Sequence, residues 1–371
     1  PEAMQLATYS GWLLRGVSGG ILAGSLFVLP GVAVLLALSL IYVNYANVPL
    51  VASVFFGLKA AVLAIVLHAL WKVASRALRG PVTALIALIA FAALFVFAVP
   101  FPAVVLCALL AGYFLPRHFA QGEGQIEPSG MDWPFRHVPS VSLWGIIAWA
   151  VPLVLLFLSL GGTSVYFEEA VFFSKVAMVT FGGAYAVLAY VGQQAVVVYG
   201  WLRADEMLTG LGLAETTPGP LILVLVFVGF MGAFRDAGGL DPVLAGIAGG
   251  LVTVWVTFIP CFIWIFLGAP FMEVLRGNVR ISGALAAVTA AVVGVIANLS
   301  LWFASHVLFA EQLSVRLGPG ELVLPDPASA MPVAILIFVL AAAALWRGFG
   351  LVSVLLIATV SGILAGQFGF A

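Results

Sequence analysis

Apolar stretches of about 20 residues recur along almost the entire chain, and this recurrence limits the possible folds more than any other feature. A bilayer with a hydrocarbon core of about 30 Å needs about 20 apolar residues for each spanning helix. Only 8% of the 371 residues are charged, whereas soluble domains carry about 25%. The sequence therefore predicts an all-α, polytopic helical membrane protein without a soluble domain.

Turn residues and charges separate the apolar stretches, and we expect a membrane helix in each of them. The stretches lie at 20–43, 50–72, 81–98, 100–115, 142–160, 166–200, 219–234, 244–268, 281–308, 332–346 and 349–368. Residues 1–15 predict one further short helix within the membrane. Two longer connections, 116–141 and 310–331, complete the chain.

The basic residues indicate how these helices are oriented, because loops rich in Lys and Arg favour the cytoplasmic side. Lys72, Arg76 and Arg79 follow the second stretch and place its end in the cytoplasm. Because successive helices cross the membrane in opposite directions, we expect 116–141 to be a cytoplasmic loop. The same reasoning places these arginines on the cytoplasmic side: Arg15, Arg117, Arg136, Arg203, Arg276, Arg280 and Arg347. The external loops receive the acidic residues Glu168, Glu169, Asp236, Asp241, Glu311, Glu321 and Asp326.

Two pairs of distant segments resemble each other and predict an internal repeat. The segment "SGGILAGSLFVLPG" at 18–31 matches "AGGLVTVWVTFIPC" at 248–261 through two glycines and a proline. The segment "GLKAAVLAIV" at 57–66 matches "GALAAVTAAV" at 283–292, in the same order along the chain. Chance similarity between Gly- and Ala-rich helices is the alternative explanation.

The charge rule gives the two copies opposite orientations across the membrane. We expect a transmembrane repeat at 1–115, a linking transmembrane helix at 142–165 that changes the parity, and an inverted repeat at 166–371. Inverted repeats with broken, re-entrant-like helices are typical of secondary transporters, which bind substrate near the bilayer midplane. The stretch at 166–200 has no counterpart in the first copy, so we expect that copy to be truncated at its start by one helix.

Two adjacent glycines, Gly182 and Gly183, lie in the middle of the stretch at 166–200. Glycine costs about 1 kcal/mol per residue in a helix interior, so the pair favours a broken helix. Unpaired backbone N–H groups at such a break can bind an anion. Close packing of small residues against a neighbouring helix would explain the glycines equally well.

Four segments together resemble the chromate ion transporter family of bacterial membrane proteins. They are "PEAMQLATYSGWLLRGVSGGILAGSLFVLPG" at the start, "GLKAAVLAIV", "FFSKVAMVTFGGAYAVLAYV" and "ETTPGPLILVLVFVGFMGA". In that family an FGG segment precedes a PGPE motif in the first half, and this chain begins at the Pro1–Glu2 of such a motif. The resemblance therefore implies that the first FGG helix is absent from this chain.

The resemblance implies a function as well as a fold. It implies an antiporter in the bacterial inner membrane that exports chromate, draws on the proton motive force and confers chromate resistance. Sulfate has the shape and charge of chromate and is the second candidate substrate. The resemblance also strengthens the assignment of Phe181, Gly182 and Gly183 to the substrate site.

Two lysines are expected about 13–14 Å into their helices, near the middle of the membrane. Lys59 lies nine residues past Leu50, and Lys175 lies nine residues past Tyr166. A lysine at the bilayer centre costs about 2.5–3.5 kcal/mol on insertion scales, so we interpret both as cations that neutralise a bound dianion. A pair between Lys175 and Glu168, or a side chain that reaches the interface, is the structural alternative.

The segment "TTPGP" at 216–220 predicts the start of a helix. Thr216 or Thr217 can cap this start, and a proline in the first turn lacks only an N–H that would be unpaired there anyway. The partial positive charge of the helix end would then face the substrate. We therefore add Thr216, Thr217 and Gly219 to the predicted substrate site.

The first copy places Pro1 and Glu2 at the position that Pro220 occupies in the second copy. Glu2 is either an acid that stabilises a first helical turn or a carboxylate that couples transport to protons. Glu215 is a further candidate for proton coupling. Gln5 can donate a hydrogen bond to an oxyanion, or it can face solvent.

The sequence contains no pattern that indicates an enzyme, a metal site or a cofactor. It lacks HExxH, GxSxG and Asp-rich motifs, and Cys107 and Cys261 are isolated in apolar stretches. Its net charge of −1 gives no basic surface for nucleic acid. We expect its partners to be the oxyanion, protons and the lipid bilayer, and a homodimer is one option. An anion channel, a carrier of another anion, an intramembrane lipid-modifying enzyme and an inactive assembly subunit are the alternatives.

Overall fold

The computed structural model describes residues 2–116, 119, 138–179, 184–268, 278–317 and 320–369. Its helices confirm the all-α, polytopic membrane fold. In these ranges, the helices that are long and apolar enough to cross a membrane are Ala3–Tyr45, Pro49–Ala77, Leu143–Leu160, Pro242–Gly268 and Val279–Leu308. Shorter apolar helices lie between and after them.

Several helices begin with a proline in the first turn, where its missing N–H would be unpaired anyway. The first half contains α1 (Glu2–Tyr45), α2 (Pro49–Ala77), α3 (Pro81–Phe95), α4 (Phe101–Phe114) and α5 (Val138–Leu160). The second half begins with α6 (Val165–Val179), α7 (Ala184–Gln193), the π-helix η3 (Gln194–Val198), α8 (Ala204–Thr216) and the 3-10 turn η4 (Leu221–Leu223). It continues with α9 (Val224–Arg235), α10 (Pro242–Gly268), α12 (Val279–Leu308), α13 (Pro332–Trp346) and α14 (Leu351–Gln367).

The connection 310–331 contains secondary structure that the sequence analysis did not predict. Strands β1 (Gln312–Leu317) and β2 (Gly320–Pro325) pair antiparallel, with Gln312 opposite Pro325 and Leu317 opposite Gly320. The short turn η6 (Pro327–Ser329) follows. Alternating apolar residues on both sides of a Gly-Pro-Gly sequence are the pattern that favours such a hairpin.

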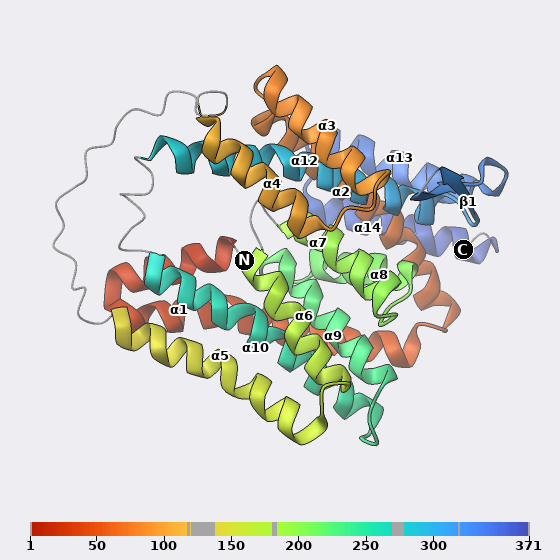
Figure 1. The fold of residues 1–371 in the computed structure, drawn as a ribbon. Helices are drawn as coiled ribbons and strands as arrows, with labels where there is room; N and C mark the ends of the chain where they lie inside the picture. The colour runs from red at the N-terminus through yellow and green to blue at the C-terminus, as the bar shows by residue number, and fades with distance from the viewer. Residues whose placement is uncertain are drawn as a thin grey trace.

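The helices form two bundles with a thin layer between them (Figure 1). In the first bundle α2, α3, α4 and α13 contact α12, and α14 packs on α2 and α13; in the second bundle α1, α5, α6 and α9 contact α10. Helices α7 and α8 lie between the bundles, where α7 packs on α12 and α8 packs on α2 and α9. Both bundles therefore combine helices from the two halves of the chain.

Helix α1 is a hairpin rather than one continuous helix. Arg15 and Gly16 have non-helical dihedral angles, and Gly16 has a φ of +64° that a glycine adopts without strain. A Cβ added at Gly11 would lie 2.7 Å from the Cβ of Ala23, although twelve residues separate the two. The chain therefore reverses at residues 15–16, and we call this element the α1 hairpin.

Helices α9 and α10 form a second hairpin with equivalent contacts. In the α1 hairpin Gly19 lies against Gly11, and in the α9–α10 hairpin Gly249 lies against Gly229. A Cβ added at Gly20 would lie 3.1 Å from the carbonyl oxygen of Thr8, and one at Gly250 would lie 3.3 Å from that of Val226. Gly19 and Gly20 are the glycines that the sequence matches to Gly249 and Gly250, so the predicted repeat is consistent with the packing.

The first bundle contains a similar pair of contacts. Gly57 of α2 lies against Gly362 of α14, and Gly283 of α12 lies against Gly112 of α4. The sequence matches Gly57 to Gly283, and each of them contacts the last helix of the opposite half. Both contacts support the predicted duplication, whose inverted orientation across a membrane stays a prediction.

Candidate functional site

The chain reverses its direction between α6 and α7. The rings of Phe172 and Tyr190 are 5.7 Å apart between centroids, whereas a continuous helix would separate residues at this spacing by about 27 Å. The predicted stretch 166–200 is therefore a pair of helices that lie side by side and are followed by a π-helix. Residues 180–183 connect the pair; the predicted site residues Phe181, Gly182 and Gly183 lie there, outside the described residues.

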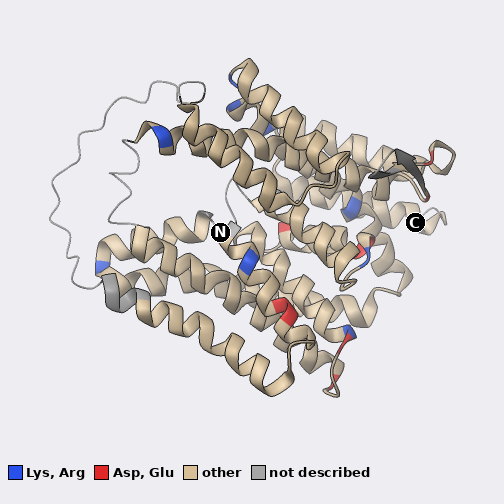
Figure 2. Ribbon diagram, in the orientation of Figure 1, with Lys and Arg blue, Asp and Glu red and all other residues tan. Residues whose placement is uncertain are grey.

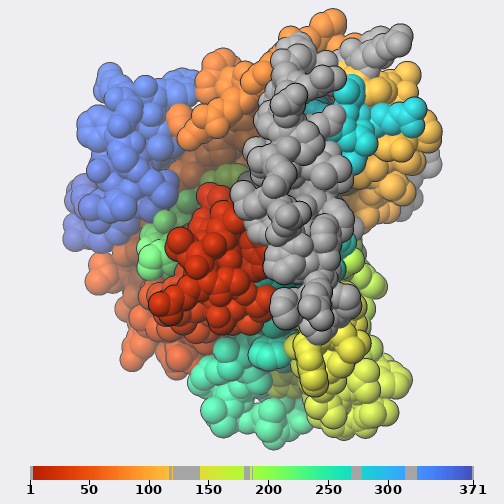
Figure 3. Space-filling view, turned by 90° about the vertical axis from the view of Figure 1, so that its left-hand side faces the viewer, coloured from red at the N-terminus to blue at the C-terminus, as the bar shows by residue number. Residues whose placement is uncertain are grey.

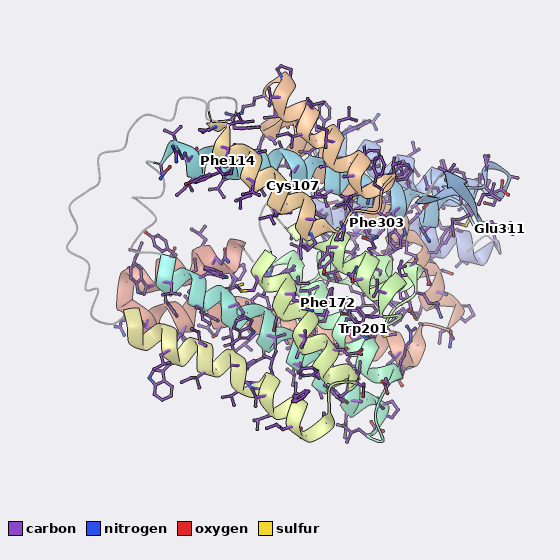
Figure 4. All side chains as sticks on the ribbon, in the orientation of Figure 1. Cys107, Phe114, Phe172, Trp201, Phe303 and Glu311 are labelled. Atoms are coloured by element: carbon purple, nitrogen blue, oxygen red, sulfur yellow. The ribbon has the colours of Figure 1, made fainter. Side chains whose placement is uncertain are left out.

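An aromatic cluster holds the two helices together. Phe172 contacts Tyr199 at 5.3 Å and Trp201 at 5.6 Å between ring centroids, and Tyr199 stacks on Trp201 at 4.3 Å. Figure 4 shows Phe172 and Trp201 next to each other, on the side of the second bundle that faces the first. Aromatic pairs of this kind contribute about 0.5–1.5 kcal/mol each beyond their buried area. The cluster therefore fixes the position at which the chain reverses.

The two glycine-containing motifs of the second half come together in the structure. Tyr185, the second residue of α7, donates a hydrogen bond from its hydroxyl to Oε1 of Glu215 at 2.7 Å. Tyr185 follows the FGG motif by two residues, and Glu215 directly precedes the TTPGP segment. The predicted residue Glu215 thus lies half-buried between the bundles, beside the start of α7.

The two threonines do not cap the helix that follows them, so this part of the prediction is wrong. Thr216 donates its hydroxyl hydrogen to the carbonyl of Leu213 at 2.8 Å, and Thr217 donates to the same carbonyl at 2.7 Å. Both threonines therefore close the C-terminal end of α8, because a hydroxyl can reach the carbonyl three or four residues earlier. Helix η4 begins after Pro220 without a side-chain cap.

The turn after Thr217 is shaped by glycine and covered by α1. Gly219 has a φ of +134°, which other residues adopt only with strain. A Cβ added at Gly31 of α1 would lie 2.5 Å from the carbonyl oxygen of Pro218. Helix α1 thus packs closely on this turn one residue after Pro30, the proline inside the helix.

The two predicted lysines lie in different surroundings. Lys175 is in the last turns of α6, four residues before the described part of α6 ends, and its side chain is exposed. It forms no ion pair with any residue that the structure describes, and this includes Glu168. Lys59 of α2 is 24% exposed, and its Nζ lies 3.2 Å from Oδ2 of Asp205 at the start of α8. Lys59 therefore has a counter-charge within the protein.

Asp205 belongs to a charge network that the sequence analysis did not predict. Arg203 Nε lies 3.1 Å from Oδ1 of Asp205, and Arg203 Nη2 lies 3.5 Å from Oε1 of Glu206. Arg203 therefore lies at the same end of the molecule as Arg235 and Asp236, so the predicted placement of Arg203 and Asp236 on opposite sides of the membrane is wrong. Glu206 is almost fully buried, and its carboxylate oxygens lie 2.6 and 2.7 Å from Nη2 of Arg235. Arg235 also donates to the carbonyl of Trp201 at 2.6 Å. Because the described helices carry few charges (Figure 2), this network is the main electrostatic link between α2, α8 and α9.

The other predicted residues of the first half, Glu2 and Gln5, lie near the start of α1. Gln5 is half-buried and its amide is close to the thiol of Cys261 in α10. Glu2 is the first residue of α1, but its side chain lies outside the described residues. The structure therefore places Gln5 against the second bundle and does not bring it together with a described lysine.

A separate polar cavity of about 360 Å³ lies between α2, α3 and α12. It is lined among others by Arg76, Arg79, Thr83, Ser282 and Thr289. The charge rule predicts that this end of α2 is cytoplasmic. Among the described residues, no group of three or more His, Cys, Asp or Glu side chains is arranged to hold a metal ion.

Comparison with known proteins relates the chain to one family of carriers. The sequence model of the family described as "Chromate transporter" matches residues 1–113 and 167–366. A "Probable chromate transport protein" of Synechococcus elongatus is 28% identical over 303 residues, which cover 80% of this chain and 69% of that protein. A "Chromate transport protein" of Cupriavidus metallidurans is 27% identical over 300 residues, or 80% of this chain and 67% of that protein. One of Pseudomonas aeruginosa is 30% identical over 306 residues, or 80% and 66%. No solved structure matches the chain.

Proposed function

The chain belongs to the chromate transporter family, and we propose that it carries chromate out of the bacterial cytoplasm across the inner membrane. It is a multi-pass membrane protein and a transport protein, not an enzyme. The relatives from Cupriavidus metallidurans and Pseudomonas aeruginosa are named for chromate transport. Sulfate, a tetrahedral dianion of the same charge, is the second substrate that we propose.

The observation that carries this proposal is the contact between Tyr185 and Glu215. It brings the start of α7 and the end of α8 together between the two bundles. Secondary transporters bind substrate at broken helices of this kind, where backbone N–H groups and helix ends face the ligand. Relative movement of the two bundles would expose such a site first to one side of the membrane and then to the other.

Lys175 supplies the first positive charge in the proposed site. Its side chain is exposed and lacks an ionic partner in the described part of the chain. A cation without a counter-charge is costly inside a membrane, and a bound dianion would provide one. The connection at 180–183, with Phe181, Gly182 and Gly183, would add backbone donors next to this charge.

Lys59 supplies the second positive charge by exchanging its partner Asp205 for the bound dianion. Its ion pair with Asp205 holds α2 on α8 in the described state. Arg203 also contacts Asp205, so Asp205 would keep a cationic partner when Lys59 turns to the dianion. Thr216 and Gly219 lie exposed at the end of α8 and complete the proposed substrate site, with Thr217 buried behind them.

Proton coupling is proposed for the carboxyl groups at this end of the two repeats. Glu215 accepts the hydroxyl hydrogen of Tyr185, so a change in its protonation would change the contact between α7 and α8. Glu2, at the matching position of the first repeat, and Gln5, as a donor to the oxyanion, are proposed from the sequence alone. Proton motive force would then drive export.

Uptake of labelled chromate into inverted membrane vesicles tests the proposal. We expect saturable uptake that sulfate inhibits and an imposed proton gradient accelerates. Lys175→Gln should lower the uptake rate at least tenfold, and Lys59→Gln should lower it by a smaller factor because Arg203 remains nearby. Lys72→Gln, which changes an exposed lysine at the end of α2, is the matched control. Normal uptake by Lys175→Gln would contradict the proposed site, and uptake that never saturates would favour an anion channel.

A further inference from the structure

A buried glutamate lies outside the proposed substrate site. The sequence analysis placed Glu169 in an external loop, but the structure places it in the second turn of α6 with none of its surface exposed. Its carboxyl group enters a niche formed by two glycines of the α9–α10 hairpin. A Cβ added at Gly232 would lie 2.5 Å from Oε1 of Glu169, and one at Gly249 would lie 2.9 Å from Oε2. The glycines therefore make room for this carboxyl group.

No cationic group accompanies Glu169 in the described structure. Neither of its carboxylate oxygens forms a hydrogen bond by strict geometric criteria, and the nearest donor is the backbone N–H of Ala233, which already belongs to helix α9. Burial of an uncompensated polar group costs about 2–7 kcal/mol, and an unpaired charge costs far more. Because Leu or Met would fill the niche without this cost, an ionisable residue here indicates a function.

The groups around Glu169 are polar but not cationic. Thr253 of α10 is fully buried beside Gly229, and its hydroxyl has no partner among the described residues. From α9 the nearest charges are Arg235, which is paired with Glu206, and Asp236. On α6 itself Glu168 and Tyr166 flank Glu169, and from the α7–α8 connection the ring of Trp201 closes the niche at Gly232.

Building on the proposed transport function, we infer that Glu169 is a proton-binding site of the carrier, separate from the oxyanion site and filled from the external side. A single carboxyl group in a buried niche that contains no described cation, between α6, α9 and α10, alternates between a neutral and an ionised form. When neutral it allows α6 to pack closely on the α9–α10 hairpin. When ionised it requires water or a cation and loosens that contact. Proton binding would thereby bias the position of α6, whose last turns carry Lys175.

A route for the proton leads from Glu169 toward the surface through Tyr166. The phenol of Tyr166 is buried, has no hydrogen-bond partner in the described part of the chain, and lies near enough to interact electrostatically with Glu169 and Asp236. Asp236 is exposed in the connection between α9 and α10. The charge rule assigns this connection to the external side, where the proton motive force delivers protons.

Glu169→Gln tests this inference, because the amide keeps the size of the carboxyl group but cannot release a proton. In vesicles we expect Glu169→Gln to retain exchange of labelled for unlabelled chromate without a gradient, and to lose acceleration by an imposed pH gradient. Tyr166→Phe should slow that acceleration several-fold. Glu168→Gln, a change of the neighbouring acid on the same helix, should behave as the unmodified protein does. Full gradient acceleration in Glu169→Gln, or acceleration by a sodium gradient at constant pH, would overturn the inference.

A second measurement does not depend on chromate. Infrared spectra of the purified protein during a pH titration should contain a band from a protonated carboxyl group that Glu169→Gln removes and Glu168→Gln retains. If this band is observed but no vesicle transports chromate, the proposed substrate is wrong and the proton site stands. If the spectra of the unmodified protein and Glu169→Gln are the same, the proton site is wrong whatever the transport assay gives.

Discussion

The α1 hairpin and the α9–α10 hairpin use the same glycine packing in very different surroundings. In the α1 hairpin Leu6, Leu14 and Leu22 are 66%, 83% and 62% exposed, and Figure 3 shows the N-terminal residues on an open face of the molecule. In the second hairpin every residue of α9 from Val224 to Ala233 is buried. The hairpin geometry therefore does not depend on burial. Close contacts of two glycines in each second arm with the first arm are sufficient to hold the arms together.

The chemistry differs more than the packing does. Gly249 faces the carboxyl group of Glu169, whereas Gly19, its counterpart in the α1 hairpin, faces Gly11 and the Cβ of Arg15. Gly232 leaves space for the same carboxyl group. Leu14 holds the equivalent position in the first arm of α1, three residues after Gly11 as Gly232 is three residues after Gly229, and it is exposed. The two hairpins therefore differ at the positions that contact the proposed functional residue Glu169.

The largest expected difference between the hairpins concerns their arginines. Arg235→Ala should lower the free energy of unfolding by about 3 kcal/mol, because it removes the closest cation from the buried carboxylate of Glu206 and leaves only the more distant and exposed Arg203. Arg15→Ala, at the exposed turn of the α1 hairpin, should change it by less than about 0.5 kcal/mol. Thermal unfolding of both variants in detergent measures the difference. Equal melting temperatures would show that the Arg235–Glu206 pair does not anchor the second hairpin.

Enlarging one glycine in each hairpin is expected to have a smaller effect. Gly249→Val should cost about 1–3 kcal/mol, since its Cβ would lie 2.5 Å from the Cβ of Ala233 in a fully packed bundle. Gly19→Val should cost less, because the first arm of α1 can move toward its open face. The ratio of folded to aggregated protein after heating compares the stability losses of the two variants. A larger loss for Gly19→Val would mean that exposure does not relieve the contact.

The smallest effect is expected at Thr253. Thr253→Val removes a buried hydroxyl that has no described partner, so the free energy of unfolding should change by less than about 0.5 kcal/mol. Ala23 follows Gly19 by one turn, as Thr253 follows Gly249, and Ala23→Val is the corresponding change in the α1 hairpin. Melting temperatures of the two variants test this. A marked loss for Thr253→Val would reveal a hydrogen bond to water or an ion in the niche.

Local composition predicted most of the helices. The helices α2, α10 and α12 lie where uninterrupted apolar stretches predict them, because spanning a bilayer depends mainly on length and hydropathy. The adjacent glycines Gly182 and Gly183 correctly indicated that the stretch 166–200 is not one helix, although only the contact between Phe172 and Tyr190 shows that the chain turns back.

The contacts within the candidate site could not be predicted from one sequence. Lys59 and Asp205 are 146 residues apart, so the ion pair that occupies Lys59 has no local pattern. Thr216 resembles a helix cap because its hydroxyl can bond forward or backward, and tertiary packing decides between the two. Glu169 resembled a loop residue because it lies beside Glu168 near a helix start, and its burial depends on glycines about 60 to 80 residues further along the chain.

The most direct test of the account is the rate of labelled chromate uptake into inverted membrane vesicles, measured with and without a proton gradient. We expect saturable uptake that the gradient accelerates, that Lys175→Gln lowers at least tenfold and that Lys72→Gln leaves unchanged. Uptake that is identical in Lys175→Gln and in the unmodified protein would contradict it, because the proposed site would then lack the cation on which dianion binding depends.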